Sequence, residues 1–103
     1  MDYRVEKWSG PGRPDEAELR KVLDAEGFRV YKWSDRPGAV YGMHSHGDDQ
    51  THWLLSGKLE LTVEGAGIFL LEAGDRDHMP GGTHHSARVV GDGPVVYLIG
   101  EKR

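Results

Sequence analysis

The stretch that decides the fold spans residues 38–57 and reads GAVYGMHSHGDDQTHWLLSG. It places His44 and His46 two residues apart, and side chains at positions i and i+2 of a β-strand point to the same face. Two imidazoles can therefore aim at one point. A third, His85, comes from a distant strand, and the amide oxygen of Gln50 can fill a fourth position. Nitrogen and oxygen donors of this kind predict a mononuclear site for a first-row divalent metal.

The distribution of histidines supports this interpretation. A single histidine on a strand is usually a hydrogen-bonding side chain, and pairs two residues apart also occur by chance. However, the chain has 6 histidines in 103 residues, and all of them lie between residues 44 and 85. We therefore predict one divalent transition metal as the cofactor, with Zn, Ni, Mn and Fe as the candidates.

The composition excludes several classes of protein. A chain of 103 residues forms one domain with one core. The absence of cysteine excludes disulfides, thiolate ligands and a cysteine nucleophile. A formal net charge of −4 argues against nucleic acid as a partner. No run approaches the roughly 20 apolar residues of a membrane helix, and residues 1–4 do not resemble a signal peptide, so we expect a cytoplasmic protein outside the membrane.

Residues 1–36 are expected to form a strand, a helix and a second strand. Residues 2–8 alternate in polarity, which indicates a short strand. Residues 14–26 begin with proline and acidic side chains, which favour a helix start, and Gly27 is a good helix stop. Leu19, Val22 and Leu23 form one apolar stripe. We expect this helix to pack against the outside of a sheet.

From Gly27 onward the hydrophobic period is two, as in β-strands. Leu59, Leu61 and Val63, for example, alternate with polar side chains. The apolar run at 68–71 is expected to be buried on both faces. Short strands are expected at 28–33, 39–46, 50–55, 58–63, 68–71, 76–79, 85–90 and 95–99. Many short strands separated by Gly or Pro predict an all-β sandwich or barrel.

Two sequence motifs resemble those of the cupin family. Residues 38–57 follow the pattern G-x5-H-x-H-x3-Q-x6-G, which is similar to the first cupin motif except that Gln50 stands where Glu is usual. Residues 74–85 follow G-x5-P-x-G-x2-H, which is similar to the second motif; the Asn that usually ends it is here Val89. The resemblance covers residues 38 to about 99, and the two motifs occur in the usual order.

The resemblance implies both a fold and a ligand set. The fold is a double-stranded β-helix, or jelly-roll barrel, over residues 37–100, with residues 1–36 adding the outer helix to a single domain of residues 1–103. Small single-domain bacterial cupins of this type are commonly homodimers. The implied metal ligands are His44, His46, Gln50 and His85.

Glutamine in place of glutamate removes the only anionic ligand. This change should weaken metal affinity, leave the ion a stronger Lewis acid and favour an anionic small-molecule ligand. Asp48 or Asp49 is the alternative source of a carboxylate. The spacing to Gly57 favours Gln50.

The remaining histidines receive different expectations. His52 lies two residues after Gln50 and should share its inward face, so it is the candidate catalytic base or a hydrogen-bond donor beside the metal. An ordinary interior histidine is an equally good interpretation. His84 should lie at the surface or the barrel rim, and His78 receives no role.

Other side chains near the motifs are expected to shape the pocket. Asp77 is a weak candidate for orienting a histidine ligand. Tyr41 and Trp53 flank the ligand strands and are expected to line a substrate pocket, whereas Met43 and Phe69 are expected in the core or pocket wall.

Three functions compete. The first is a metal-dependent enzyme that acts on a small oxygenated metabolite by isomerase, cyclase or lyase-type proton transfer, or by dioxygenase chemistry with Fe. The second is a non-catalytic, metal-dependent binding or sensing module. The third, a structural relic, conflicts with four intact ligand positions. A metal pocket that opens to solvent and carries polar groups would favour the enzyme.

Overall fold

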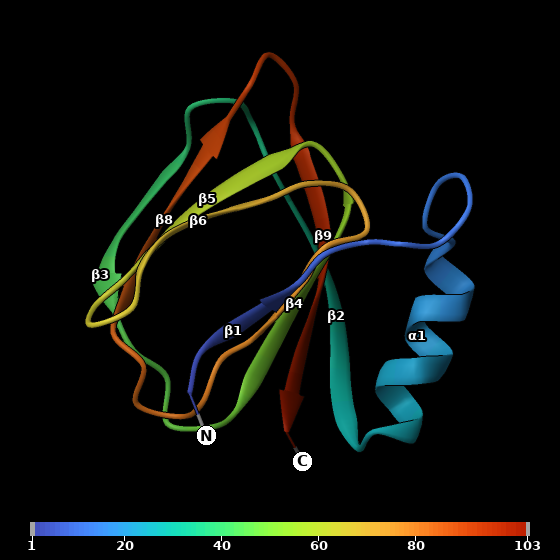
Figure 1. Ribbon diagram of the computed structural model, residues 1–103, viewed down its shortest axis with the longest axis horizontal. Coiled ribbons are helices and arrows are strands. Elements are labelled where there is room, and N and C mark those ends of the chain that lie inside the picture. Colours follow the sequence, from blue (N-terminus) through green and yellow to red (C-terminus); the bar gives the residue numbers. More distant parts are fainter. Residues whose placement is uncertain (1, 103) are drawn as a thin grey trace.

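Two antiparallel sheets face each other and enclose a common interior (Figure 1). The structure is a computed structural model that describes residues 2–102. Its elements are β1 Arg4–Glu6, α1 Glu16–Ala25, β2 Phe28–Asp35, β3 Val40–His44, β4 Gln50–Ser56, β5 Lys58–Val63, β6 Gly67–Leu71, β7 Arg76–His78, β8 His85–Val90 and β9 Val95–Lys102. One sheet has the order β1-β7-β4-β9-β2, and the other has the order β3-β8-β5-β6. The all-β prediction is confirmed.

Alternating side chains of both sheets fill the interior. On β5, Leu59, Leu61 and Val63 are buried, as the period of two predicts. The interior cluster consists of Leu54, Leu59, Leu61, Val63, Leu71, Met79, Val89, Val95 and Tyr97. This apolar core adjoins the polar side chains that converge at one end of the interior.

The helix α1 packs on the outside of the five-stranded sheet, as predicted (Figure 1). It is shorter than the expected 14–26, because the Asp15 side chain accepts a hydrogen bond from the Glu18 N–H at 3.0 Å and so caps the helix. Leu19 and Leu23 are buried against the sheet, whereas Val22 turns to solvent. Gly27 ends the helix with a φ of 89°, a conformation that favours glycine.

Three strands differ from the sequence-based expectation. In β6, Ile68 is 69% exposed while Leu71 is buried, because only one face of the four-stranded sheet packs against the core. The prediction of a strand buried on both faces is therefore wrong. Met43 on β3, which was expected in the core or the pocket wall, is exposed as well. Strand β3 ends at His44 after a register shift that follows Tyr41, and β9 continues past residue 99 to Lys102.

The two sheets are not joined by a backbone ladder between β2 and β3. Strand β2 is an edge strand of the five-stranded sheet, and β3 is an edge strand of the four-stranded sheet. Side chains connect them instead: the Asp35 carboxylate accepts hydrogen bonds from the Trp33 indole N–H at 2.8 Å and from the Tyr41 hydroxyl at 2.7 Å. Trp33 lies on β2 and Tyr41 on β3, so this triad bridges the two sheet edges.

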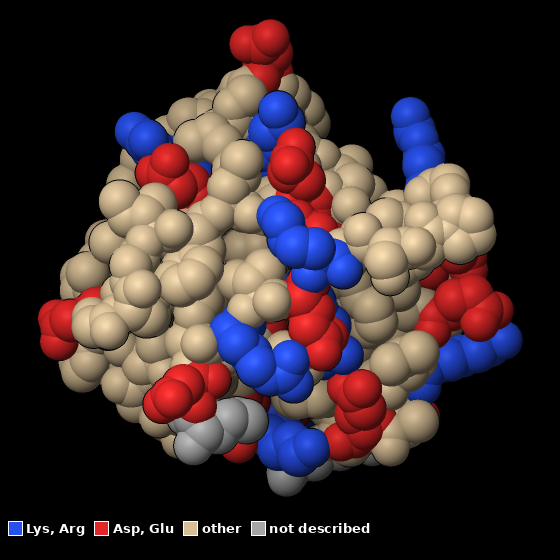
Figure 2. Space-filling view, viewed as in Figure 1, with Lys and Arg blue, Asp and Glu red and all other residues tan. Residues whose placement is uncertain are grey.

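Charged side chains are mixed on the face that carries β1 (Figure 2). Arg4 pairs with Glu6 at 2.9 Å, and Lys7 pairs with Asp75 at 2.8 Å. Within residues 2–102, no helix is long and apolar enough to cross a membrane.

Candidate metal centre

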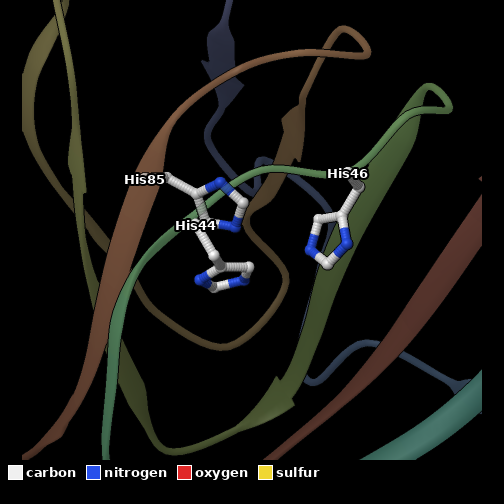
Figure 3. Close-up of side chains that lie close together, drawn as sticks. All are labelled: His44, His46 and His85. Atoms are coloured by element: carbon white, nitrogen blue, oxygen red, sulfur yellow. The ribbon is translucent and has the colours of Figure 1, made fainter.

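Three histidines converge at one end of the interior (Figure 3). His44 is the last residue of β3 and lies opposite His85, the first residue of β8, in the antiparallel register. His46 follows in the loop after β3. One ligand nitrogen from each ring lies within 4.8 Å of the other two. The predicted grouping of these three side chains is therefore present in the fold.

The loop that carries His46 is held by the turn of the second motif. The Gly82 N–H donates to the His46 carbonyl at 2.7 Å, and the Gly81 N–H donates to the Asp49 carboxylate at 2.8 Å. A Cβ at position 81 would lie 2.8 Å from the Gly47 carbonyl oxygen, so the two loops approach as closely as glycine allows. The two motifs thus pack against each other, and His46 reaches the cluster without lying on the strand.

Backbone carbonyls orient two of the rings. The Nδ1 of His44 lies 2.7 Å from the Gly42 carbonyl, and the Nδ1 of His85 lies 3.0 Å from the Thr83 carbonyl. A proton on each Nδ1 leaves the Nε2 lone pair available as a ligand. Burial lowers the pKa of His46 and of His85, and the neighbouring imidazoles add to this effect. Both rings therefore favour the neutral form that binds metal.

The donor set fits a first-row divalent ion. Imidazole nitrogens bind such ions at about 2.0–2.1 Å, so nitrogens that lie within 4.8 Å of one another can share one ion after small side-chain adjustments. Cysteine is absent, and three neutral nitrogens suit Zn, Ni, Mn or Fe better than an alkaline-earth ion.

Gln50 is the first residue of β4 and is only 5% exposed. Its amide nitrogen donates to the Asp48 carboxylate at 3.3 Å and to the Glu101 carboxylate at 3.4 Å. Two anionic acceptors fix the orientation of the amide, and its carbonyl oxygen accepts no hydrogen bond from a side chain within residues 2–102. Neither Asp48 nor Asp49 belongs to the group of ligand atoms formed by the histidines.

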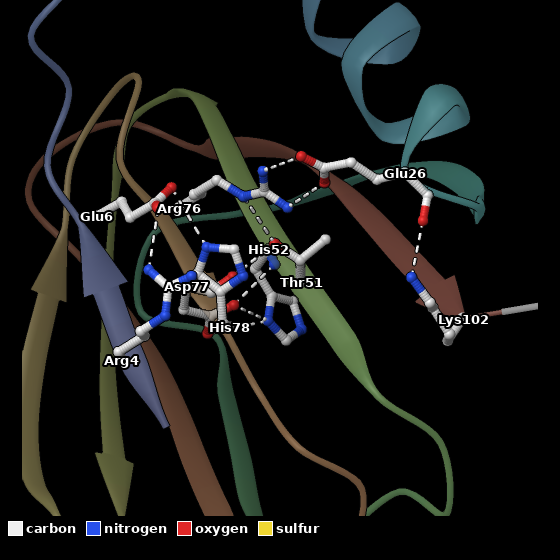
Figure 4. Close-up of polar contacts among 9 residues, drawn as sticks. All are labelled: Arg4, Glu6, Glu26, Thr51, His52, Arg76, Asp77, His78 and Lys102. Carbon is white, nitrogen blue, oxygen red and sulfur yellow. Dashed lines mark hydrogen bonds and ion pairs between the residues drawn. The ribbon is translucent and has the colours of Figure 1, made fainter. Parts of the chain in front are cut away.

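His52 forms a buried pair with Asp77 (Figure 4). Its Nδ1 lies 3.0 Å and 3.1 Å from the two Asp77 oxygens, and its backbone N–H donates to the same carboxylate at 2.7 Å. The fully buried Asp77 also accepts from the Tyr3 hydroxyl at 2.9 Å. Burial alone would lower the pKa of His52, but the Asp77 charge outweighs it and the pKa is raised. Asp77 thus orients His52, whereas the expectation paired it with a metal-ligand histidine.

A pocket of about 220 Å³ connects the histidine cluster to the β2–β3 edge. Its lining residues are Trp33, Tyr41, His44, His46, Gln50, His52, Leu59, Leu61, His85, Ala87, Tyr97, Ile99 and Glu101. Tyr41 lines the pocket as predicted. Trp53 does not, because it points to the other face of β4 and packs beneath α1, where its indole N–H donates to the Gly74 carbonyl at 2.8 Å.

The two remaining histidines lie outside the cluster. His84 is exposed, as predicted from its place beside His85. His78 lies with its Nε2 3.2 Å from the Glu6 carboxylate.

Sequence reasoning missed Trp33, Tyr97 and Glu101 in the pocket. The alternation pattern places Trp33 on a strand but gives it no role. Tyr97, Ile99 and Glu101 share one face of β9, and continuing the alternation past residue 99 would have placed Glu101 on the same face as Tyr97.

Comparisons with known proteins identify the family of the domain that carries this site. A family model described as "Cupin domain" matches residues 31–100. A search of curated proteins gives no match. A solved structure of DMSP lyases is 25% identical, with a TM-score of 0.68 over 74% of this chain and 38% of that chain. Oxalate decarboxylase from Bacillus subtilis, described with Mn(II) centres, is 26% identical, with a TM-score of 0.60 over 74% of this chain and 26% of that chain.

A third structure matches nearly end to end. The DUF861 family protein from Thermotoga maritima is 20% identical, with a TM-score of 0.62 over 95% of this chain and 97% of that chain. This match supports the double-stranded β-helix, or jelly-roll, fold. By contrast, this chain spans well under two thirds of the lyase and decarboxylase chains.

Proposed function

The chain belongs to the cupin family, and from this we propose that it is a metal-dependent cupin acting on a small oxygenated metabolite. The observation that carries the proposal is the convergence of His44, His46 and His85 at the wall of a pocket. Gln50 is proposed as the fourth ligand, through its carbonyl oxygen. Zn, Ni, Mn and Fe remain the candidate metals, and the Mn(II) centres named for the decarboxylase are consistent with this set.

Proton transfer is the proposed type of chemistry. A divalent ion held by His44, His46 and His85 would supply Lewis-acid chemistry for a carbonyl or enolate oxygen. His52 lines the same pocket, and Asp77 holds its Nδ1, so its Nε2 is the atom available to accept a proton from a ligand. Two of the similar structures reported above are named as DMSP lyases and an oxalate decarboxylase, which favours isomerase, cyclase or lyase-type chemistry over dioxygenase chemistry.

The pocket favours a small ligand. Its volume of about 220 Å³ lies below the roughly 300–1,000 Å³ of sites for drug-sized molecules. No lysine or arginine occurs among its lining residues in the described part of the chain, so the positive charge that would attract an anionic group comes from the proposed metal. We propose a small metabolite that would bind directly to the metal through one anionic oxygen group.

A binding or sensing module is the second candidate function. Aromatic residues at the pocket rim, Trp33 and Tyr41, would suit a module that only retains a ligand. The polar groups of His52 and Glu101 inside the pocket favour turnover. Assembly as a homodimer, a cytoplasmic location and the absence of a nucleic-acid partner stay predictions.

The test combines metal analysis with a proton-exchange assay. Protein without a histidine tag should contain one divalent metal per chain, and His85→Ala should lose it while His84→Ala keeps it. Small keto and hydroxy acids should then exchange a carbon-bound proton with D2O, detected by NMR, in wild type but not in His52→Ala. Wild-type protein that binds no divalent metal would refute the proposal. Ligand binding without exchange would favour the binding module.

A further inference from the structure

One carboxylate in the pocket has no counterpart in the sequence motifs. Glu101 lies on β9 directly opposite Gln50 on β4 in the antiparallel register, and its side chain lines the pocket. On the other neighbouring strand, β2, Arg29 lies opposite Glu101 in the antiparallel register. Within residues 2–102, however, no basic side chain forms an ion pair with Glu101 at 4.0 Å or less. A half-buried carboxylate without an ion-pair partner calls for another source of compensation.

The polar partner of Glu101 is the Gln50 amide. The Nε2 of Gln50 lies 3.4 Å from the Glu101 carboxylate and 3.3 Å from the Asp48 carboxylate. Both acceptors bind the nitrogen end of the amide, so the carbonyl oxygen is the end left for the pocket.

We propose that Glu101 supplies, through Gln50, the negative charge that the cupin motif usually places at position 50. It acts as a positioning residue: it holds the Gln50 carbonyl oxygen toward the histidines and balances the charge of a divalent ion. Asp48 has the same role from the preceding loop. This inference rests on the proposed metal site. It differs from a direct carboxylate ligand, because Glu101 lies outside the group of ligand atoms.

The first test measures metal affinity. Zn²⁺ is titrated calorimetrically into metal-free, untagged wild type and Glu101→Gln. We expect the dissociation constant to rise about 10–100-fold, the usual effect of removing a partner behind a ligand. The matched control is Glu18→Gln, an exposed glutamate on α1, which packs on the outside of the five-stranded sheet, so the same charge is removed away from the site; its effect should stay within about threefold because surface charges are screened. Asp48→Asn should weaken binding in the same direction and provides the test if Glu101→Gln fails to fold.

A charge swap tests whether Glu101 acts through Gln50. In the double variant Gln50→Glu with Glu101→Gln, the hydrogen bond between the two side chains is reversed and the total charge is unchanged. Zn²⁺ affinity should return at least to the wild-type value. In Gln50→Glu alone, three carboxylates lie together, so the metal-free protein should melt at a lower temperature than the double variant.

The outcomes separate this inference from the proposed function. A wild type that binds no divalent metal overturns both. A wild type that binds Zn²⁺ no more tightly than Glu101→Gln overturns the role of Glu101 alone. If Glu101→Gln costs the same affinity in the wild-type protein and in the Gln50→Glu variant, the positioning role is overturned, because a carboxylate at position 50 donates no hydrogen bond to Glu101. The d–d spectrum of Co²⁺ should change in Glu101→Gln if the Gln50 oxygen is displaced.

Discussion

Replacing Asp77 by asparagine should remove the decline in stability that the metal-free protein shows as the pH rises above ~6.5. The Asp77 charge raises the pKa of His52, although burial alone would lower it. A histidine whose folded pKa is raised contributes stability that is fully present below its unfolded pKa of about 6.5. This stability is lost as the pH rises through the folded pKa. Wild-type protein should therefore become less stable above pH ~6.5.

The histidines of the metal cluster should cause a second decline in stability, at low pH. Burial lowers the pKa of His46 and of His85 in the folded protein. The unfolded chain consequently binds more protons below pH ~6.5, so stability falls as the pH drops below that value. Stability should peak near pH ~6.5, and Asp77→Asn should abolish only the decline above the peak.

The hydrogen bonds to Asp77 set the size of the effect. Its carboxylate accepts from the Tyr3 hydroxyl at 2.9 Å, from the His52 backbone N–H at 2.7 Å and from the His52 Nδ1 at 3.0 Å. Asparagine keeps one acceptor oxygen and turns an NH2 group toward a donor. The loss of one charge-assisted bond costs about 1.5–3 kcal/mol, and one unsatisfied buried group costs about 1–3 kcal/mol. At pH values below the peak, Asp77→Asn should therefore lower the free energy of unfolding by roughly 2.5–6 kcal/mol. The wild-type decline cannot exceed about 1.4 kcal/mol per pH unit for one proton.

Urea unfolding with a chelator present, followed by tryptophan fluorescence at several pH values, measures both quantities. The matched control is Asp75→Asn. Asp75 is also buried and accepts from the Trp8 N–H at 2.8 Å, so its loss should destabilise the protein without removing the decline. A decline above the peak that persists in Asp77→Asn, or that also disappears in Asp75→Asn, would refute the reasoning.

Four further predictions concern the metal centre. Metal affinity should fall steeply below pH ~6, because three imidazoles must lose protons to bind, and titrations at a series of pH values would contradict this if affinity stayed constant. His85→Ala should abolish metal binding while its neighbour His84→Ala keeps it, as elemental analysis would show. His52→Ala should retain nearly all the metal and lose turnover; loss of the metal would instead make His52 a ligand. Gly81→Ala should destabilise the protein by about 1–3 kcal/mol and weaken metal binding, because its Cβ would lie 2.8 Å from the Gly47 carbonyl oxygen, whereas Gly93→Ala, with open space around it, serves as the control in thermal melts.

The sequence predicts what depends on local pattern. Alternation identified the buried face of β5, and motif spacing selected His85 over His84, because adjacent residues on a strand face opposite ways. The approach of His44 to His85 follows from the pairing of β3 with β8, whereas His46 lies in the loop after β3, where the rule for side chains two residues apart on a strand does not apply.

Features set by tertiary packing could not be predicted in this way. Whether Ile68 is buried depends on what covers the outer face of its sheet, and the side of β4 on which Trp53 lies depends on where the helix packs. The partner of Asp77 depends on the pairing of strands distant in sequence. Glu101 was missed because charged residues near a chain end usually belong to solvent, and only the register of β4 against β9 brings it beside Gln50.

We expect the Trp33–Asp35–Tyr41 triad to control how quickly a molecule enters and leaves the pocket, because Trp33 and Tyr41 line it. Because side chains rather than a backbone ladder join β2 to β3, the indole and phenol rings can rotate away without breaking a sheet hydrogen bond. Rotamer changes of exposed side chains take on the order of picoseconds to nanoseconds, whereas opening of the paired strands requires local or global unfolding. Residence time in the pocket is thereby uncoupled from the lifetime of the fold. A cavity at Leu71, a core residue that is not among those lining the pocket, should shorten the lifetime of the folded state, whereas truncation of Trp33 should shorten the residence time of a bound molecule.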